Sequence, residues 1–447
     1  MYLVRQLLRL GIYSVFVFAH WSCLSLSPVW GGELSAKRAE YRGEEPSGII
    51  ALRHALSMAL MHNPELNAFS LEVRAQEARV LQAGLLPNPE IEIEAENFGG
   101  SGDFRSSDSA EATIQLSHLV ELGGKRSKRK RVASLERDLA QWDYESKRAD
   151  VLTEVTTAFV DVLASQERVA LAEELVSLAE RVLDTVSARV KAGKVSPVEE
   201  AKARVTSSTS HIALERAKRK LEASRKQLAA TWGSKTPLFE KVEGQLGEIR
   251  PIPSEGLLES AIFHGPDIAR WGTEMEQRQA SVALEDAKKI SDPTISLGAR
   301  HFNEDDDNAL VLAVSIPIPI FDRNQGGTLE ARERLAKADK EHQAAKMRAL
   351  NDLAGAYQSL SSAYFEATIL KRDVLSSAQA AFETSTKGYR QGKFDYLVLL
   401  DAQRTLFDAQ KQYLEGLAEY HKSKARVERL IASPIDNVTL SKSEASK

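Results

Sequence analysis

Two hydrophobic periodicities alternate along this chain, one typical of helices and one typical of strands. Residues 125–192 contain neither proline nor glycine, and their apolar side chains recur every three or four positions. This spacing predicts an amphipathic helix of about 65 residues, on the order of 100 Å long. A second stretch without proline covers residues 327–391 and predicts another very long helix.

A further helix is expected after each long one, because a turn signal separates the two. Gly193 is followed at 196–199 by SPVE, which combines a capping-box pattern with proline at the first helical position. The helix that begins there should continue to about Thr231. In the second half, Asp395 is expected to cap a last helix that ends near Ala432.

Strict alternation marks four short segments as strands. Residues 90–96 read EIEIEAE, which places the charges on one face and the apolar side chains on the other. The predicted strands are 89–97, 110–120, 293–302 and 309–320, and shorter helices over 49–84 and 255–289 precede them. The polar face is predicted to carry Glu90, Glu92, Glu94, Glu96, Glu111, Thr113, Gln115, Thr294, Ser296 and Arg300. The apolar face is predicted to carry Ile91, Ile93, Ala95, Ala112, Ile114, Leu116, Ile295, Leu297, Ala299, Leu310, Leu312, Val314 and Ile316.

The same unit occurs twice, at a separation of about 200 residues. Residues 49–245 and 246–432 each read as helix, strand, strand, very long helix, helix, and a polar tail follows at 433–447. The fold class is therefore mainly α with β, built on a duplicated repeat. The matching strings are Asn63-Pro64-Glu65-Leu66 with Gly265-Pro266-Asp267-Ile268, the segments after Pro89 and Pro293, the ends of the strand pairs near Gly123 and Phe321, and the turns at Gly193 and Gly392.

Helices of this length do not enclose a globular core, so they indicate a coiled coil, a bundle or a helical tube. A simple coiled-coil rod does not account for two strand pairs inserted at equivalent places. Four strands are too few to close a barrel, for which about eight are needed. The strands therefore either join strands of other copies in a membrane barrel or form a soluble sheet packed under the helices.

The N-terminus has the features of a secretory signal peptide. Arg5 and Arg9 precede a short apolar run, and we place the peptide at 1–31 and a linker at 32–48. An N-terminal membrane anchor is the alternative, and the short run disfavours it. The single cysteine, Cys23, is a candidate lipidation site, although the residues before it make a poor lipobox.

Composition and motifs argue against several functions. A formal net charge of −4 supplies no basic field for nucleic acid. The sequence contains no HExxH, GxSxG, Walker-type or GxGxxG motif, so we expect no enzyme activity and no cofactor. Asp305, Asp306 and Asp307 with His301 and Glu304 could bind a cation through oxygen ligands, but a charged external loop is the simpler interpretation. None of the nine histidines has a partner at i+4.

Two groups of short strings carry a resemblance to known proteins. The first group is Asn63-Pro64, Leu85-Leu86-Pro87-Asn88-Pro89, and Gly392 with Leu400-Asp401-Ala402-Gln403 and Leu406-Phe407. With these strings the sequence resembles a known family, the TolC-type outer-membrane factors, over about residues 50–432. The second group is Glu121-Leu122-Gly123-Gly124-Lys125-Arg126 and the stretch from Ile316 to Gly326. These strings resemble the branch that serves metal-efflux pumps of the cobalt–zinc–cadmium (CzcC) type.

The resemblance implies a homotrimer in the outer membrane, with a 12-stranded β-barrel on a periplasmic α-helical barrel. Such a trimer is a passive export duct, and it docks on an inner-membrane RND-type transporter through a periplasmic adaptor (membrane fusion protein). The cargo implied by the branch is divalent heavy-metal cations, although the sequence does not identify it. The alternative is a periplasmic coiled-coil adaptor or structural protein, which should show one helical hairpin between β-rich domains.

The resemblance also implies roles for individual residues. The turns with Gly193, Lys194, Gly392 and Lys393 would be the periplasmic tips that meet the adaptor. Asp401 takes the position of a carboxylate ring at the pore entrance, and Tyr389 lies near a tyrosine that latches the gate. Phe394 occupies the position of the latching arginine. The alternating glutamates Glu90, Glu92, Glu94 and Glu96 would line the barrel lumen.

Overall fold

The computed structural model describes residues 45–437. The predicted signal peptide over 1–31, the candidate lipidation site Cys23 and residues 32–44 of the predicted linker lie outside the described residues. The helices and strands of the described residues belong to one unit, which begins at Pro46.

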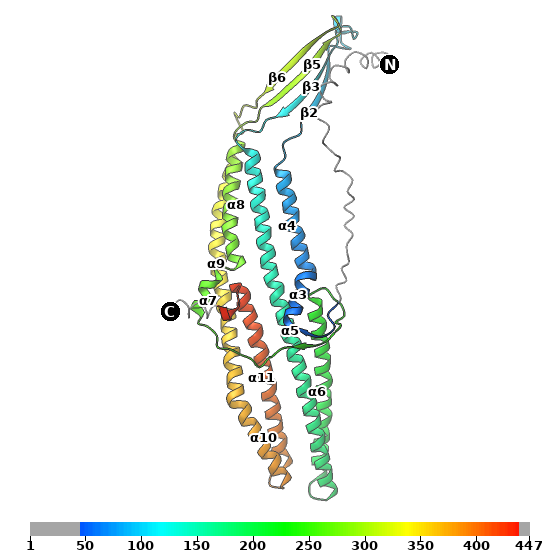
Figure 1. Ribbon diagram of the computed structural model, residues 1–447, viewed down its shortest axis with the longest axis vertical. Coiled ribbons are helices and arrows are strands. Elements are labelled where there is room, and N and C mark those ends of the chain that lie inside the picture. The colour runs from blue at the N-terminus through cyan, green and yellow to red at the C-terminus, as the bar shows by residue number, and fades with distance from the viewer. Residues whose placement is uncertain (1–44, 438–447) are drawn as a thin grey trace. The chain divides into compact units, whose positions relative to one another are not determined.

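The first repeat is built around one uninterrupted helix. Helix α5 (Lys125–Lys191) has 67 residues, which corresponds to about 100 Å at 1.5 Å per residue. It is preceded by α3 (Leu52–His62) and α4 (Pro64–Ala83) and followed by α6 (Pro197–Ala230). Helix α4 lies beside the part of α5 nearer the strands, and α6 lies beside the other part (Figure 1). The predicted long helix and its successor are confirmed.

The second repeat has the same order of elements, with one irregularity. Helices α7 (Glu255–Ile262) and α8 (Pro266–Lys288) correspond to α3 and α4, and α11 (Tyr396–Ile431) corresponds to α6. The long helix is divided into α9 (Gln325–Ile369), a π-helical turn η2 (Leu370–Val374) and α10 (Leu375–Arg390). The continuous helix predicted over 327–391 therefore contains a π turn, which neither proline nor glycine marks in the sequence.

The single helices predicted over 49–84 and 255–289 are wrong, because each is broken before a proline. The residue before a proline is driven out of the helical region, and Asn63 and Gly265 have extended ψ angles of 121° and 150°. Asn63 also stabilises the break. Its Oδ1 accepts from Leu66 N at 2.9 Å, and its Nδ2 donates to the Thr231 carbonyl at 2.8 Å.

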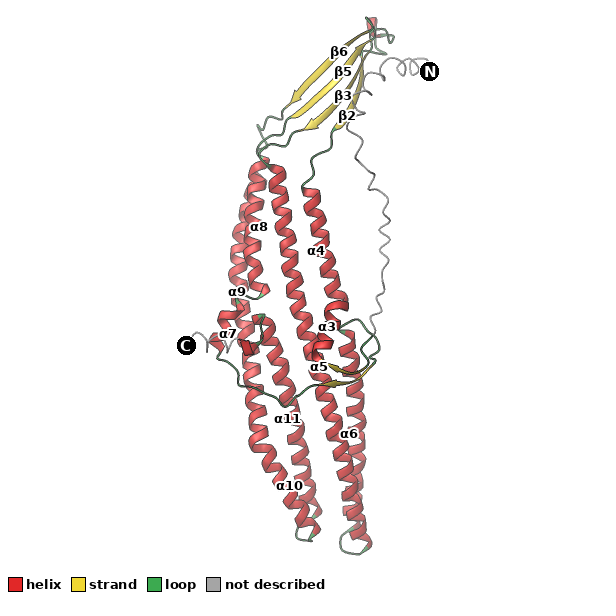
Figure 2. Ribbon diagram, viewed as in Figure 1, coloured by secondary structure: helices red, strands yellow, loops and turns green. Residues whose placement is uncertain are grey.

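The four predicted strands form one antiparallel sheet in the order β2-β3-β5-β6 (Figure 2). They are β2 (Glu90–Glu96), β3 (Glu111–Leu119), β5 (Thr294–Phe302) and β6 (Asp307–Ser315). A 3-10 turn η1 (Gly102–Phe104) lies in the loop between β2 and β3. The pairing of β3 with β5 joins the two repeats. The prediction of a strand over 309–320 is wrong beyond residue 315, because Pro317 and Pro319 have no N–H to donate to a ladder.

A second, two-stranded sheet was not predicted. Strand β1 (Gly48–Ala51) pairs in parallel with β4 (Phe239–Glu243), which precedes the second repeat. Ile50, Phe239 and Val242 of these strands are buried. The four-residue β1 leads directly into α3, so its sequence is difficult to separate from the helix.

The largest hydrophobic cluster surrounds the middle of α5. Apolar side chains of α5 between Val151 and Ala164 pack there against α3, the two short strands, the end of α6 and Leu417 of α11. A second cluster joins α7, α9 and α11. Ile435 is buried in that second cluster, and its N–H donates to Glu428 at 3.0 Å. The predicted polar tail at 433–447 is therefore wrong at its start, where Ile435 anchors the chain.

Candidate functional site at the helix tips and on the sheet

The turns that join α5 to α6 and α10 to α11 have the same geometry. Gly193 and Gly392 have φ angles of +69° and +72°, which side chains with a Cβ rarely adopt. In each turn the following lysine donates its N–H five residues back at 2.9 Å, Lys194 to Arg189 O and Lys393 to Gly388 O. This is a glycine-terminated helix end. Both turns lie at the end of the helices opposite the four-stranded sheet (Figure 1).

Tyr389 lies in a cluster that joins the two hairpins near these turns. Its side chain is buried with Tyr396, Leu399 and Leu400 of the second hairpin and with Val186 and Ala203 of the first. Burial raises the pKa of the Tyr389 phenol, and the charge of Arg189 opposes that rise. Tyr389 therefore contributes to packing between the two hairpins as a neutral aromatic ring.

Arg189 of the first hairpin holds Tyr389 of the second. The Arg189 guanidinium carbon lies 4.5 Å from the centroid of the Tyr389 ring, within cation–π range. Arg189 Nη1 also donates to the Tyr389 carbonyl at 3.0 Å. The two residues are 200 positions apart in the sequence, and their contact fastens the ends of the hairpins to each other.

Phe394 occupies a different place beside the same cluster. A Cβ built on Gly388 would lie 2.2 Å from the Phe394 ring, so the ring packs directly on the glycine. The guanidinium beside Tyr389 is thus supplied by Arg189, from the other repeat, and not from position 394. Arg189 was not among the predicted site residues, although it aligns with Gly388 when the two turns are compared.

Asp401 is exposed in the second turn of α11. Within residues 45–437, its carboxylate forms no ion pair. Asp395 occupies the predicted N-cap position of α11, but its side chain accepts no capping hydrogen bond. The predicted capping role of Asp395 is therefore wrong. Among the described residues neither Asp395 nor Asp401 has an ion-pair partner, and both carboxylates are exposed near the tip.

The register of the sheet confirms the two predicted faces. Glu92 lies opposite Gln115, which lies opposite Gly298, and Gln115 Nε2 donates to Glu92 at 2.6 Å. The same face holds Glu90, Glu94 and Glu96 of β2, all of them exposed. A row of four carboxylates therefore follows the free edge of the sheet.

Arg300 supplies positive charge within this acidic face. Its guanidinium reaches Glu111 at 2.9 Å and Glu96 at 3.5 Å, and Nε donates to Thr113 Oγ1 at 2.9 Å. Arg300 thus links β5 to β3 and β2 at the end of the sheet remote from the helices. Glu90 and Glu92, nearer the helices, have no ion pair among the described residues.

The opposite face of the sheet is apolar and exposed. Ile93 is 76% exposed and Leu310 is 86% exposed, and their neighbours on that face are similar. A contiguous apolar surface of this kind marks a site of contact with lipid or another protein. The exposed members are Ile91, Ile93, Ile114, Leu116, Ile295, Leu297, Leu310, Leu312 and Val314.

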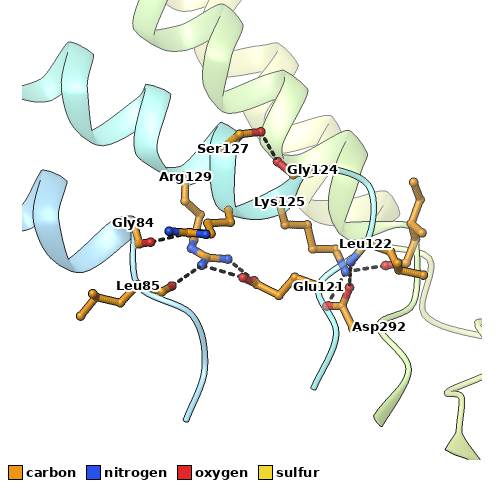
Figure 3. A network of polar contacts seen from close by, with 11 residues as sticks. Gly84, Leu85, Glu121, Leu122, Gly124, Lys125, Ser127, Arg129 and Asp292 are labelled. Atoms are coloured by element: carbon orange, nitrogen blue, oxygen red, sulfur yellow. Dashed lines mark hydrogen bonds and ion pairs between the residues drawn. The ribbon is translucent and has the colours of Figure 1, made fainter. Parts of the chain in front are cut away.

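A polar network fixes the junction between the sheet and the helices (Figure 3). Lys125, the first residue of α5, bridges to Asp292 at 2.7 Å, and Asp292 also accepts from Leu122 N at 2.8 Å. Arg129 forms a bidentate pair with Glu121 and donates to the Leu85 carbonyl. The network therefore holds together three chain crossings, at 84–89, 120–124 and 289–293.

The described residues contain neither a helix that could span a membrane nor a cluster of metal ligands. Within residues 45–437, every helix is too short or too polar to traverse a lipid bilayer. In the same part of the chain, no three His, Cys, Asp or Glu side chains converge as metal ligands would. Near the candidate cation loop, the His301 ring contacts Asn308 at 3.2 Å and lies 3.9 Å from Asp306, and Asp307 is the first residue of β6.

The duplicated helices, the shared four-stranded sheet and the paired hairpin tips define a class of protein. The sequence pattern of the outer membrane efflux protein family matches residues 55–234 and 257–433, which fall in the two structural repeats. The chain belongs to this family. The predicted resemblance to TolC-type outer-membrane factors and the predicted fold class are confirmed.

One curated relative and two solved structures are similar to most of this chain. The cobalt-zinc-cadmium resistance protein CzcC of Cupriavidus metallidurans is 38% identical over 387 residues, which cover 87% of this chain and 91% of that protein. The outer-membrane channel OprN superposes with a TM-score of 0.72 at 17% identity, over 86% of this chain and 90% of that one. CusC, described in terms of transmembrane channel formation, superposes with a TM-score of 0.70 at 17% identity, over 86% and 92%.

Proposed function

We propose that three copies of this chain form the outer-membrane duct of a tripartite efflux pump, and that the duct passes divalent heavy-metal cations. The observation that supports this most directly is the four-stranded sheet, which is apolar and exposed on one face and acidic on the other. A wall between lipid and a water-filled lumen requires this division. The duct does no chemistry.

The sheet requires further copies of the chain to close. Both outer strands, β2 and β6, have one free edge in the described chain, and a free edge is unsatisfied in hydrocarbon. Strand β6 of one copy can pair with β2 of the next, since the antiparallel alternation then continues around the ring. Three copies supply twelve strands, which exceeds the approximate minimum of eight for a closed barrel.

The helices also display surfaces suited to neighbouring copies. Val198, Val205 and Ile212 are exposed on α6 at intervals of seven residues, the repeat of helices packed side by side. On the opposite edge, Leu329, Met347 and Phe365 are exposed on α9 at intervals of eighteen residues, which is about five helical turns. The stripe on α6 lies in the half of the helices that ends at the tips, and the stripe on α9 begins beside the sheet (Figure 1). Each stripe would therefore face a different part of the adjacent copy in the periplasmic helical barrel.

The acidic face fits a cationic cargo. Glu90, Glu92, Glu94 and Glu96 would line the barrel lumen, and three copies would present twelve of these carboxylates around it. A field of one sign raises the local concentration of counter-ions. The name of the relative CzcC indicates resistance to cobalt, zinc and cadmium, which supports divalent metal cations as the cargo here.

The helix tips would form the entrance and the docking surface. Asp401, exposed near the tip, would give a ring of three carboxylates, and the contact between Tyr389 and Arg189 would hold the hairpins of each copy in the closed position. The turns with Lys194 and Lys393 would meet a periplasmic adaptor, which connects the duct to an inner-membrane RND-type transporter. That transporter would supply the energy.

The first test is to fractionate cells that express the full chain and to size the detergent-extracted particle. An outer-membrane trimer supports the duct, and a soluble periplasmic monomer or dimer refutes it in favour of a coiled-coil adaptor or structural protein. The trimer should then conduct in planar bilayers with a preference for cations. Replacing Glu90 and Glu92 by glutamine should weaken that preference, and replacing Glu259, an exposed glutamate of α7, should leave it unchanged.

A further inference from the structure

An exposed apolar segment follows the last strand of the sheet. Residues 316–321 read IPIPIF and connect β6 to the turn before α9. Ile318 is 78% exposed and Phe321 is 90% exposed, and Ile316 and Ile320 are each 61% exposed. We name these six residues the apolar arm. The described residues leave most of the surface of these side chains uncovered, so the arm displays apolar surface.

The backbone of the arm is bonded within the arm and the turn that follows it. Ile320 N donates to Ile318 O at 2.9 Å, and Arg323 Nε donates to Pro319 O at 3.1 Å. Gln325 Nε2 donates to Phe321 O at 3.1 Å. Since Pro317 and Pro319 have no N–H, the arm is not built to add another strand to the sheet. A partner would therefore contact the side chains of the arm and not its backbone.

The first repeat contains no such arm, which provides an internal comparison. At the equivalent junction, residues 120–124 are held against the protein. Val120 N donates to Pro293 O at 2.9 Å, and Leu122 N donates to Asp292 at 2.8 Å. The Glu121 side chain is buried in its pair with Arg129. This junction exposes one large apolar side chain, Leu122 at 41%, whereas the arm exposes four, so an apolar arm of this size is specific to the second repeat.

The arm continues the apolar face of the sheet. On β6 that face is formed by Leu310, Leu312 and Val314, which point to the same side as their partners in the register. Ile316 and Ile318 keep the same alternation. Each of them precedes a proline, and a proline holds the preceding residue in an extended conformation.

The height of the apolar face favours lipid as the partner. Leu310 and Val314 are four residues apart, which gives about 13 Å along the strand and about 10 Å along the axis of a barrel with strands tilted by about 40°. The apolar band of an outer-membrane barrel is about 25 Å tall. If the apolar face continues to Ile318, its height along the barrel axis is about 20 Å. An aromatic residue, Phe321, followed by the cationic Arg323 is typical of a membrane interface.

We propose that the apolar arm lies in the membrane, where its side chains contact the acyl chains of the periplasmic leaflet. The inference rests on the proposed function, since it requires the apolar face of the sheet to face lipid. The hydrocarbon of the membrane then extends past the end of β6 onto the segment that connects the sheet to the helices. The arm fixes the depth of the second repeat in the bilayer.

The test uses spin labels on the full-length trimer, reconstituted in vesicles of phosphatidylethanolamine and phosphatidylglycerol. Cys23 is first replaced by serine, and one label is then placed at Ile318→Cys. Leu312→Cys provides the matched control on the apolar face of the same strand, and Val311→Cys provides the control on the opposite face. Collision with oxygen reports hydrocarbon, and collision with a water-soluble nickel chelate reports water.

The expected result is that the label at 318 behaves as the label at 312 does, with several-fold more collisions with oxygen relative to nickel than at 311. A label at 318 that collides readily with nickel would place the arm in water and overturn the proposal. A label protected from both reagents would show that a neighbouring copy covers the arm, which would also overturn it. If the label at 312 does not meet lipid, the duct itself is refuted, and the arm proposal with it.

Discussion

In the proposed duct, Arg189→Ala should weaken the closed position of the hairpins. The change removes a guanidinium that lies 4.5 Å from the Tyr389 ring and donates to the Tyr389 carbonyl at 3.0 Å. A cation–π contact at a partly buried site contributes about 1 kcal/mol, and a hydrogen bond from a charged donor contributes about 1.5 kcal/mol. Allowing for screening by solvent, the sum is about 2 kcal/mol per copy, which corresponds to about 30-fold in the ratio of closed to open hairpins.

The assay is single-channel conductance of the purified trimer in planar bilayers. Arg189→Ala should raise the open probability, and Arg189→Lys should restore part of the closure, since lysine keeps the charge but has no planar group to stack on the ring. Arg216→Ala, at an exposed position of α6, is the matched control and should resemble the wild type.

A double-mutant cycle separates the contact from general destabilisation. If Arg189 and Tyr389 act as one unit, Tyr389→Leu combined with Arg189→Ala should open the duct no further than the more severe single change. The reasoning is refuted if Arg189→Ala leaves the conductance unchanged while thermal unfolding shows an intact trimer. Additive effects of the two substitutions would mean that the residues act through separate neighbours.

Three further predictions concern other parts of the chain. Asp401→Asn should raise the conductance through a widened or less charged entrance, and unchanged conductance and ion preference would exclude Asp401 from the pore. Lys125→Met leaves Asp292 unpaired at a junction where the lysine side chain is 10% exposed, so the free energy of unfolding should fall by about 2–4 kcal/mol in chemical denaturation. Burial lowers the pKa of His421, and its hydrogen bond to a backbone carbonyl only partly opposes this. The folded state therefore favours neutral His421, and the stability it contributes is present above about pH 6.5 and is lost as the pH falls toward the lowered value. His421→Gln should flatten that part of the stability–pH curve.

Much of the fold was predictable because the sequence is locally consistent. The alternation in residues 90–96 determines the two faces of β2 whichever strand lies beside it. The absence of proline and glycine between Lys125 and Lys191 similarly predicts one helix. A proline indicates where a helix ends, because it drives the preceding residue out of the helical region. The helix predictions that ran through Pro64 and Pro266 failed because that effect was neglected. The strand prediction that ran through Pro317 and Pro319 failed because these residues have no N–H for a ladder.

The remaining features depend on contacts that are distant in sequence. No local pattern indicates that β3 should pair with β5 across the repeats, or that Gly48–Ala51 should pair with Phe239–Glu243. Arg189 is unremarkable within its own helix, and its role follows from its position over Tyr389. Ile435 reads as part of a polar tail, yet it is buried where α7, α9 and α11 meet. Sequence reasoning therefore identified the elements of the candidate site but not the residue that connects its two halves.

The π turn at Leu370–Val374 makes the two hairpins unequal. A π turn accommodates one additional residue, and one residue rotates the side chains beyond it by about 100° around the helix axis. The sheet keeps its two-fold repetition within each chain, but α10 follows a π turn that the continuous α5 lacks, so the two hairpins differ in helix phase near their tips. Around a ring of three copies, the six hairpin ends would alternate between two kinds. A partner that contacts all six must therefore bind in two distinct ways, or must itself contain two similar but unequal repeats.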